Sequence, residues 1–166
     1  MSPRFRVYHS RDLLGAELSA VYSRLIALMS GLAQGMKFGE SLQATLFARG
    51  LAEMSRFVVA RDGYERTSFG LSGAGNLHVD TRGEGSVDFQ MGLHLAKNAD
   101  KSAEDLAESF GQPARELLDL LAAFSEVNDE LTMELHLLEA AHAVLHAQVP
   151  PVEVVKGLMS LPALYE

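Results

Sequence analysis

The residues that could do chemistry are concentrated in a glycine-rich segment, FGLSGAGNLHVDTRGEGSVDF, at residues 69–89. Such loops bind phosphate when they join a strand to a helix, because amides at the helix N-terminus face the anion. The first glycines, Gly70, Gly73 and Gly75, do not have the Gly-x-Gly-x-x-Gly spacing of dinucleotide sites, and the flanking segments have helical patterns. Acidic residues also outnumber arginine and lysine here, which disfavours a phosphate. Chemistry alone therefore predicts tight turns between helices.

Three histidines and one charge pair are the other candidate groups. His142 and His146 are one helical turn apart and His136 precedes them, a pattern similar to metal-ligand spacing. No glutamate completes an HExxH motif, so we predict no metal site. Arg49 and Glu53 are spaced for an ion pair on one helix face, and a surface or interface pair is the favoured interpretation over catalysis.

The charge and composition of the chain limit the classes of partner that it can bind. The chain has 14 basic and 22 acidic residues, a net charge of -8, which would repel a polyanion, so we predict no nucleic acid partner. With no cysteine there is no disulfide or thiolate, which favours the cytoplasm. The N-terminus is polar, and no uninterrupted apolar run approaches the roughly 20 residues that span a bilayer. We therefore predict no membrane association.

The elements that must position these groups are predicted to be helices throughout. Apolar residues recur at steps of three and four over residues 10–32, with Ser10 as the expected N-cap. A second long helix is predicted over 41–63 and a short one over 88–96. Helical patterns continue from Ser102, where Ser-x-x-Asp forms a capping box, to a last helix with proline in its first turn. The sequence predicts one all-α domain over residues 1–166.

Three separated motifs together resemble a known family. They are SPRFRVYHSRDLLGAELSAVYSRLIALMSGLAQGMKFGES, ATLFARGLAEMSRF and GLSGAGNL. In this order and spacing they resemble the C-terminal, helical domain of NAD(P)-dependent glycerol-3-phosphate dehydrogenase. The resemblance is close up to Phe57 and over residues 70–77, and loose after residue 100. It implies a multi-helix domain like the C-terminal domain of 6-phosphogluconate dehydrogenase-like enzymes.

The resemblance also implies what the first helix once did. Family members have a catalytic lysine followed by asparagine where this chain has Ser23 and Arg24. Serine has no useful pKa near neutrality, so the proton-transfer role is expected to be lost. The family's Gly-x-Gly-Asp-Leu has an aspartate that supports the lysine, and here that position is Asn76. Both changes together avoid a buried aspartate without its counter-charge.

The phosphate-binding positions are altered as well. The family's Arg-Asn pair aligns with Val87 and Asp88, and its preceding threonine aligns with Asp80. A cation has thus become apolar and a neutral donor has become an anion. The resemblance therefore implies that the glycine-rich segment descends from a phosphate-facing loop, and that Arg24, Asp80, Val87 and Asp88 line a degenerate substrate pocket.

The resulting function hypotheses come from different classes. The first is a glycerol-3-phosphate dehydrogenase helical domain that interconverts no substrate and binds no cofactor by itself, because the family's NAD(P) domain would precede it. A chain that begins near the start of the family's second domain is expected either from a natural truncated gene or from an expressed fragment. The second is a helical dimerisation or docking module, whose partner is a second copy or a separate nucleotide-binding domain. The third, ranked lower, is a binder in which Arg24 holds a small anion.

Overall fold

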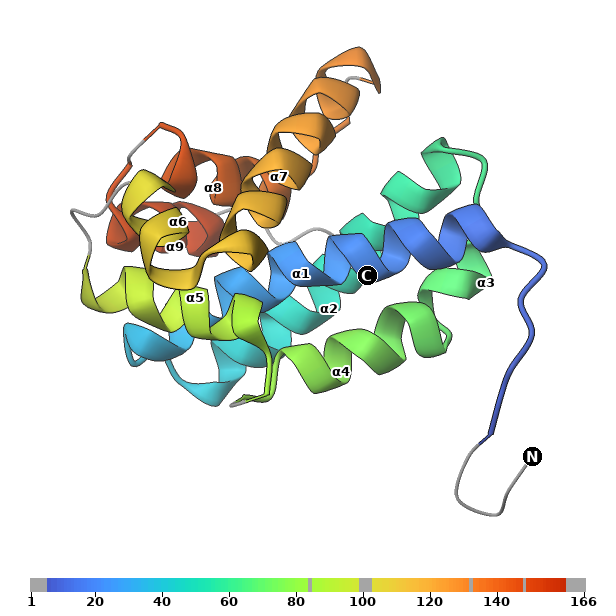
Figure 1. Ribbon diagram of the computed structural model, residues 1–166, viewed down its shortest axis with the longest axis horizontal. Coiled ribbons are helices and arrows are strands. Elements are labelled where there is room, and N and C mark those ends of the chain that lie inside the picture. The colour runs from blue at the N-terminus through green and yellow to red at the C-terminus, as the bar shows by residue number, and fades with distance from the viewer. Residues whose placement is uncertain (1–5, 84, 99–102, 132, 148, 161–166) are drawn as a thin grey trace.

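The computed structural model describes residues 6–83, 85–98, 103–131, 133–147 and 149–160. Helices dominate this part of the chain, which contains no strand, so the all-α prediction is confirmed. The predicted capping residue Ser102 lies outside the described residues. The elements shown in Figure 1 are α1 (Leu13–Gly35), α2 (Glu40–Ala60), α3 (Glu65–Ser68), the π-helical turn η1 (Leu71–Gly75), α4 (Asn76–Asp80), α5 (Val87–Lys97), α6 (Ala103–Phe110), α7 (Gln112–Leu131), α8 (His136–Leu145) and α9 (Pro151–Ser160).

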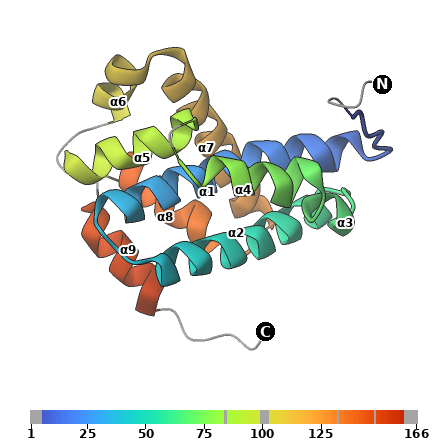
Figure 2. The same cartoon turned by 90° about the horizontal axis from the view of Figure 1, so that it is seen from below.

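Helix α1 is the centre of the fold. It contacts α2, α4, α5, α7 and α8, and Figures 1 and 2 show it running through the bundle. Every residue over 22–33 is buried except Arg24. By length and composition α1 is also apolar enough to cross a membrane, but 56% of its most apolar window is buried inside the protein. Burial of nearly all of residues 22–33 explains the apolar composition of this half of the helix.

The start of α1 differs from the sequence prediction. Asp12, not Ser10, is the N-cap residue, and its carboxylate accepts the Gly15 N–H at 2.8 Å. The same carboxylate accepts the Tyr64 N–H at 2.8 Å and the Thr67 hydroxyl at 2.6 Å. Thr67 is the main cause of the lowered pKa of Asp12. Asp12 therefore ties α1 to the α3 segment, and these distant partners decide which of two capping residues is used.

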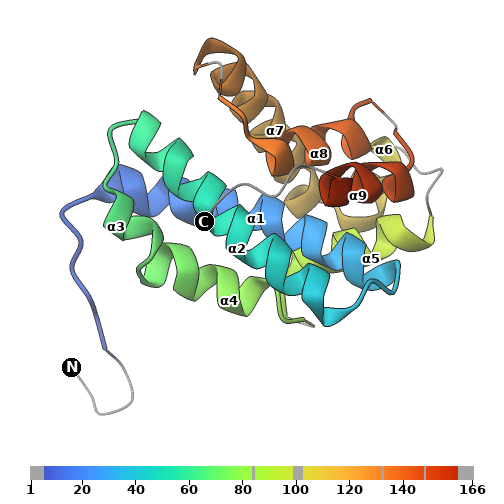
Figure 3. The same ribbon diagram turned by 180° about the vertical axis from the view of Figure 1, so that it is seen from behind.

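The remaining helices form a second group. Figure 3 shows α6, α8 and α9 gathered at the end of the molecule opposite α3, and both α7 and α8 contact α1. Tyr22 of α1, Phe57 of α2 and Phe124 of α7 form an aromatic cluster with ring centroids 4.7 to 5.8 Å apart. This cluster is the apolar junction between the first two helices and the second group.

The prediction that Glu53 forms a surface ion pair with Arg49 is wrong, because Glu53 is buried and has other partners. Only 4% of Glu53 is exposed, and its carboxylate accepts the Tyr22 hydroxyl at 3.1 Å. Both of its oxygens also accept the Leu137 N–H, at 3.0 and 3.1 Å, in the first turn of α8. A helix N-terminus has free N–H groups and a positive dipole, so it is a better partner for a buried carboxylate than a flexible arginine.

Candidate functional site

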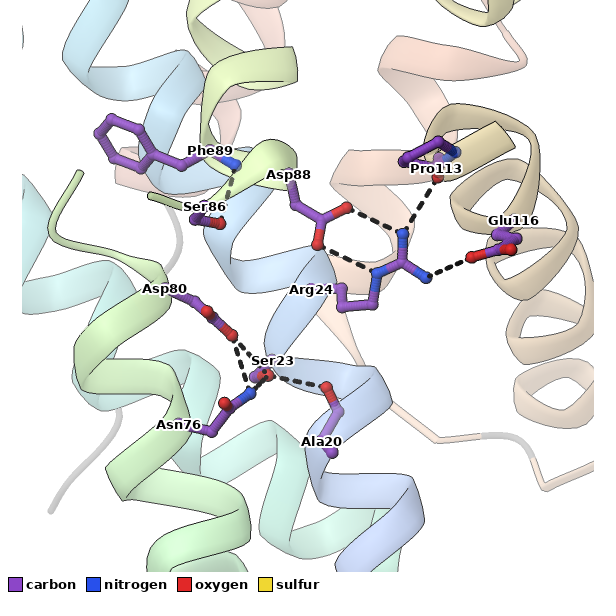
Figure 4. Close-up of polar contacts among 10 residues, drawn as sticks. All are labelled: Ala20, Ser23, Arg24, Asn76, Asp80, Ser86, Asp88, Phe89, Pro113 and Glu116. Atoms are coloured by element: carbon purple, nitrogen blue, oxygen red, sulfur yellow. Dashed lines mark hydrogen bonds and ion pairs between the residues drawn. The ribbon is translucent and has the colours of Figure 1, made fainter. Parts of the chain in front are cut away.

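The glycine-rich segment is helical where turns between helices were predicted. Residues 71–75 form the π-helical turn η1, which continues directly into α4. A side chain at Gly73 would collide with the carbonyl of Ser68, so this glycine permits close packing rather than phosphate contact. Isolated π turns are frequent at functional sites. Here the turn places Asn76, the first residue of α4, against α1 (Figure 4).

Three of the site residues predicted from the sequence form one polar cluster. The Asn76 amide donates to the Ser23 hydroxyl oxygen and to the Asp80 carboxylate, both at 2.8 Å. Ser23 donates to the Ala20 carbonyl at 2.8 Å and lies 3.3 Å from the same Asp80 oxygen. Figure 4 shows the three side chains converging between α1 and α4. Ser23 is 0% exposed, so its hydroxyl is committed to these internal hydrogen bonds.

A second cluster is built around Arg24. Its Nε and Nη2 atoms each donate to an oxygen of Asp88 at 3.0 Å, a two-point ion pair between α1 and α5. Nη2 also donates to the Pro113 carbonyl of α7 at 3.0 Å, and Nη1 lies 3.9 Å from Glu116. Sequence reasoning placed Arg24 and Asp88 at the site but missed Pro113 and Glu116, because no pattern in α7 indicates a link to a helix so far away in the chain.

Val87 is adjacent to Asp88 but has no part in either cluster. It is 45% exposed at the first position of α5, and its side chain has no polar atom. Ser86 caps the helix by accepting the Phe89 N–H at 3.3 Å. The cation nearest in the site, Arg24, is paired with Asp88.

Burial sets the electrostatics of Asp80. It raises the pKa of this carboxyl above its ordinary value of 3.8, the hydrogen bond from Ser23 opposes the shift, and the nearby charge of Asp88 adds to it. Asp80 and Asp88 together outweigh Arg24, so the local charge is negative. An arrangement of this kind disfavours a phosphate dianion.

The shifted pKa of Asp80 predicts a specific pH dependence. A carboxyl with a raised pKa in the folded state contributes stability that is present below 3.8 and lost as pH rises through the folded pKa. Asparagine cannot ionise. We therefore expect the free energy of unfolding of Asp80→Asn to rise relative to that of the wild type as pH increases from 3.5 to 7. Urea unfolding of both proteins across this range measures the difference. Asp129→Asn on the exposed face of α7 is the matched control, and a difference independent of pH would contradict the assignment.

The histidines do not assemble a metal centre in the described part of the chain, which has no group of three metal-ligating side chains. His142 and His146 lie with ring centroids 5.0 Å apart, and His136 pairs with Glu139 at 3.5 Å. Burial, followed by the charge of His142, lowers the pKa of His146. The rings of His142 and His146 are thus neighbours at the C-terminal end of α8.

Comparison with known proteins decides the family. Residues 12–156 match the family model described as the NAD-dependent glycerol-3-phosphate dehydrogenase C-terminus. The chain belongs to this family. It is 35% identical over 164 residues to a glycerol-3-phosphate dehydrogenase [NAD(P)+] of Koribacter versatilis, and 38% identical over 161 residues to one of Oleidesulfovibrio alaskensis. These alignments cover 99% and 94% of this chain, and 48% and 46% of the relatives.

Solved structures of glycerol-3-phosphate dehydrogenases are also similar to this chain. A crystal structure of glycerol-3-phosphate dehydrogenase from Coxiella burnetii superposes with a TM-score of 0.88 at 29% identity, covering 96% of this chain and 48% of that one. A Dunaliella salina enzyme superposes at 0.81 with 20% identity, which supports the fold alone. The family resemblance and its fold are therefore confirmed. The chain spans about half the length of the curated relatives it matches.

Proposed function

We propose that this glycerol-3-phosphate dehydrogenase helical domain does not perform the family's reaction with its own residues. Interconversion of glycerol 3-phosphate and dihydroxyacetone phosphate needs a titratable group to exchange the hydroxyl proton and cations to bind the phosphate. The observation that supports the proposal is that the five polar positions which the resemblance assigns to the site bond to one another. Ser23, Asn76 and Asp80 form one closed network, and Arg24 and Asp88 form the other.

NAD(P), the family's cofactor, does not fit the glycine-rich segment of this domain. A dinucleotide site uses amides at a helix N-terminus after a strand. Here Gly73 packs on the Ser68 carbonyl, and the Gly75 N–H donates within the turn to the Gly70 carbonyl at 3.0 Å. We therefore propose that NAD(P) is not held by these residues alone.

The test compares turnover and binding. The purified chain is assayed with NADH or NADPH and dihydroxyacetone phosphate, alone and mixed with the nucleotide-binding half of a full-length relative, and that relative is the positive control. We expect background rates in both cases. Calorimetric titration with glycerol 3-phosphate should give no heat, since two aspartates face any incoming phosphate. Turnover that is present in the wild type and lost in Asp80→Asn would refute the proposal.

A second candidate function is docking on a separate nucleotide-binding domain. Exposed apolar side chains occur on the elements that meet where α1 begins. We call them the apolar end surface: Leu13, Val59, Tyr64, Phe69 and Leu71, each at least 50% exposed. Hydrogen bonds from Asp12 join α1 to α3 here, and Gly63 after α2 packs on Gly15. Exposed apolar groups gathered at one place are typical of interaction sites.

The relatives favour one occupant for this surface. They are about twice as long as the chain, and the matching model is their C-terminus, so in them further polypeptide precedes the start of α1. Light scattering of the chain mixed with the nucleotide-binding half of a relative tests docking, with Leu71→Glu as the disruptive variant and Val152→Glu in α9 as control. A dimer of the chain alone, or no complex, would count against this candidate. We also propose a cytoplasmic location, supported by the absence of cysteine from the sequence.

A further inference from the structure

The carboxylate of Asp12 divides its two oxygens between the start of α1 and a distant part of the chain. Oδ1 accepts the Gly15 N–H at 2.8 Å and so caps α1. Oδ2 accepts the Tyr64 N–H at 2.8 Å and the Thr67 hydroxyl at 2.6 Å. Hydrogen bonds to an ionised acceptor are stronger than those between neutral groups. One side chain therefore fixes residues 64–67 against the start of α1.

Residues 64–71 depend on ties of this kind, because the helix that they contain is short. Helix α3 has only four residues, and so short a helix is not stable by itself. A second tie to α1 is the contact between the buried hydroxyls of Ser19 and Ser68, which lie 3.4 Å apart. A side chain at Gly15 would collide with the Asp12 carboxylate, so glycine leaves room for both oxygens to reach their donors.

The same segment carries most of the apolar end surface. Tyr64, Phe69 and Leu71 lie in it, and Leu13 directly follows Asp12 in the chain. We infer that Asp12 is the positioning residue of the apolar end surface, which it holds in one arrangement before a partner binds. This inference rests on the proposed docking of a nucleotide-binding domain at that surface. A surface that is ordered in advance binds more tightly, because less conformational entropy is lost on association.

Asp12→Asn separates this positioning role from the capping of α1. Asparagine is as good an N-cap as aspartate, so its oxygen keeps the Gly15 N–H and α1 is retained. Its NH2 group then takes the place of Oδ2 and faces the Tyr64 N–H, so that one donor meets another. Thr67→Val removes the hydroxyl donor with little change of shape, whereas Thr67→Ser keeps a hydroxyl and should behave as the wild type does.

Hydrogen exchange followed by NMR, on the full chain without a partner, tests the order of the segment. The Thr67 and Gly70 amides donate to carbonyls within it, at 2.9 and 3.1 Å. We expect both to exchange about tenfold faster in Asp12→Asn and Thr67→Val, with the amides of α5 unchanged. Asp62→Asn is the matched control, since this exposed residue in the turn after α2 has a φ of 64°, which asparagine tolerates.

Calorimetric titration of the same variants with the nucleotide-binding half of a relative tests the consequence for docking. We expect binding about tenfold weaker in Asp12→Asn and Thr67→Val, as when only one molecule in ten has the competent arrangement. Thr67→Ser and Asp62→Asn should bind as the wild type does. Thermal unfolding verifies that each variant is folded, and Thr67→Val decides the result if Asp12→Asn does not fold.

The two measurements distinguish failure of this inference from failure of the proposed docking. Unchanged exchange of the Thr67 and Gly70 amides in the folded variants overturns the inference. Equal docking of Thr67→Val and Thr67→Ser overturns it as well, because the hydroxyl would then have no role in binding. If the wild type does not dock, the docking candidate fails, and the exchange rates alone decide whether Asp12 orders this surface.

Discussion

Gly31→Ala is expected to destabilise this protein severely, by about 3 kcal/mol or more, because it forces apart α1 and α5, whose backbones are in direct contact. A Cβ at Gly31 of α1 would collide with the backbone carbonyl oxygen of Phe89 in α5, and would lie 2.8 Å from the carbonyl carbon. Backbone atoms cannot rotate away as a side chain can. Gly92 of α5 meets the Leu28 carbonyl of α1 in the same way, so each helix contributes a glycine to the contact.

Urea unfolding followed by circular dichroism measures the effect of Gly31→Ala. Gly157→Ala is the matched control, since it is the same chemical change in helix α9, where an added Cβ would meet nothing within 4 Å. We expect this control to gain roughly 0.5–1 kcal/mol from helix propensity. If both variants were equally stable, the close approach of α1 and α5 would be wrong.

Glu53→Ala is the second substitution for which we expect a large effect, a loss of about 3 kcal/mol in the free energy of unfolding. The substitution removes the acceptor of the Tyr22 hydroxyl and of the Leu137 N–H, both inside the protein. Burial raises the pKa of Tyr22 well above 10.0, so its hydroxyl keeps the proton and would be left without a partner. The N-terminus of α8 would lose its link to α1 and α2.

Hydrogen exchange combined with urea unfolding checks this prediction, because loss of the link should expose the α8 amides before the rest of the chain. Arg49→Gln is the control, since an Arg49–Glu53 surface pair would make both substitutions matter. We expect the change at Arg49 to stay within about 0.5 kcal/mol of the wild type. An equal loss in the two variants would restore the pair predicted from the sequence.

The comparison of wild type with Glu53→Gln adds a pH dependence. Burial raises the pKa of Glu53 above 4.5, and the hydrogen bonds from Leu137 and Tyr22 oppose this shift. The stability contributed by such a group is present below 4.5 and lost as pH rises through the folded pKa. The free energy of unfolding of the wild type should therefore increase relative to that of Glu53→Gln as pH falls from 7 to 4.5. Unfolding at several pH values measures the trend, and a constant difference would contradict it.

Local pattern was sufficient for the helices and for the residue types at the site. The sequence predicts α1, α2 and α5 within a few residues. For α1 the prediction rests on the three-and-four spacing of apolar residues, which follows from helix geometry itself. The family motifs supply the positions of Ser23, Asn76 and Asp88, because alignment transfers position in the chain. Alignment also predicts that these positions have changed their chemistry.

Tertiary structure decided which groups meet. Ser10 and Asp12 are both capping residue types, and the Tyr64 N–H and Thr67 hydroxyl far along the chain select Asp12. Glu53 has the right spacing for Arg49, yet the N-terminus of α8 takes its carboxylate. The pairing of Arg24 with Asp88 depends on the close packing of α1 on α5. Spacing along one helix specifies what shares a face, whereas the partner across that face is set by the packing of segments distant in the chain.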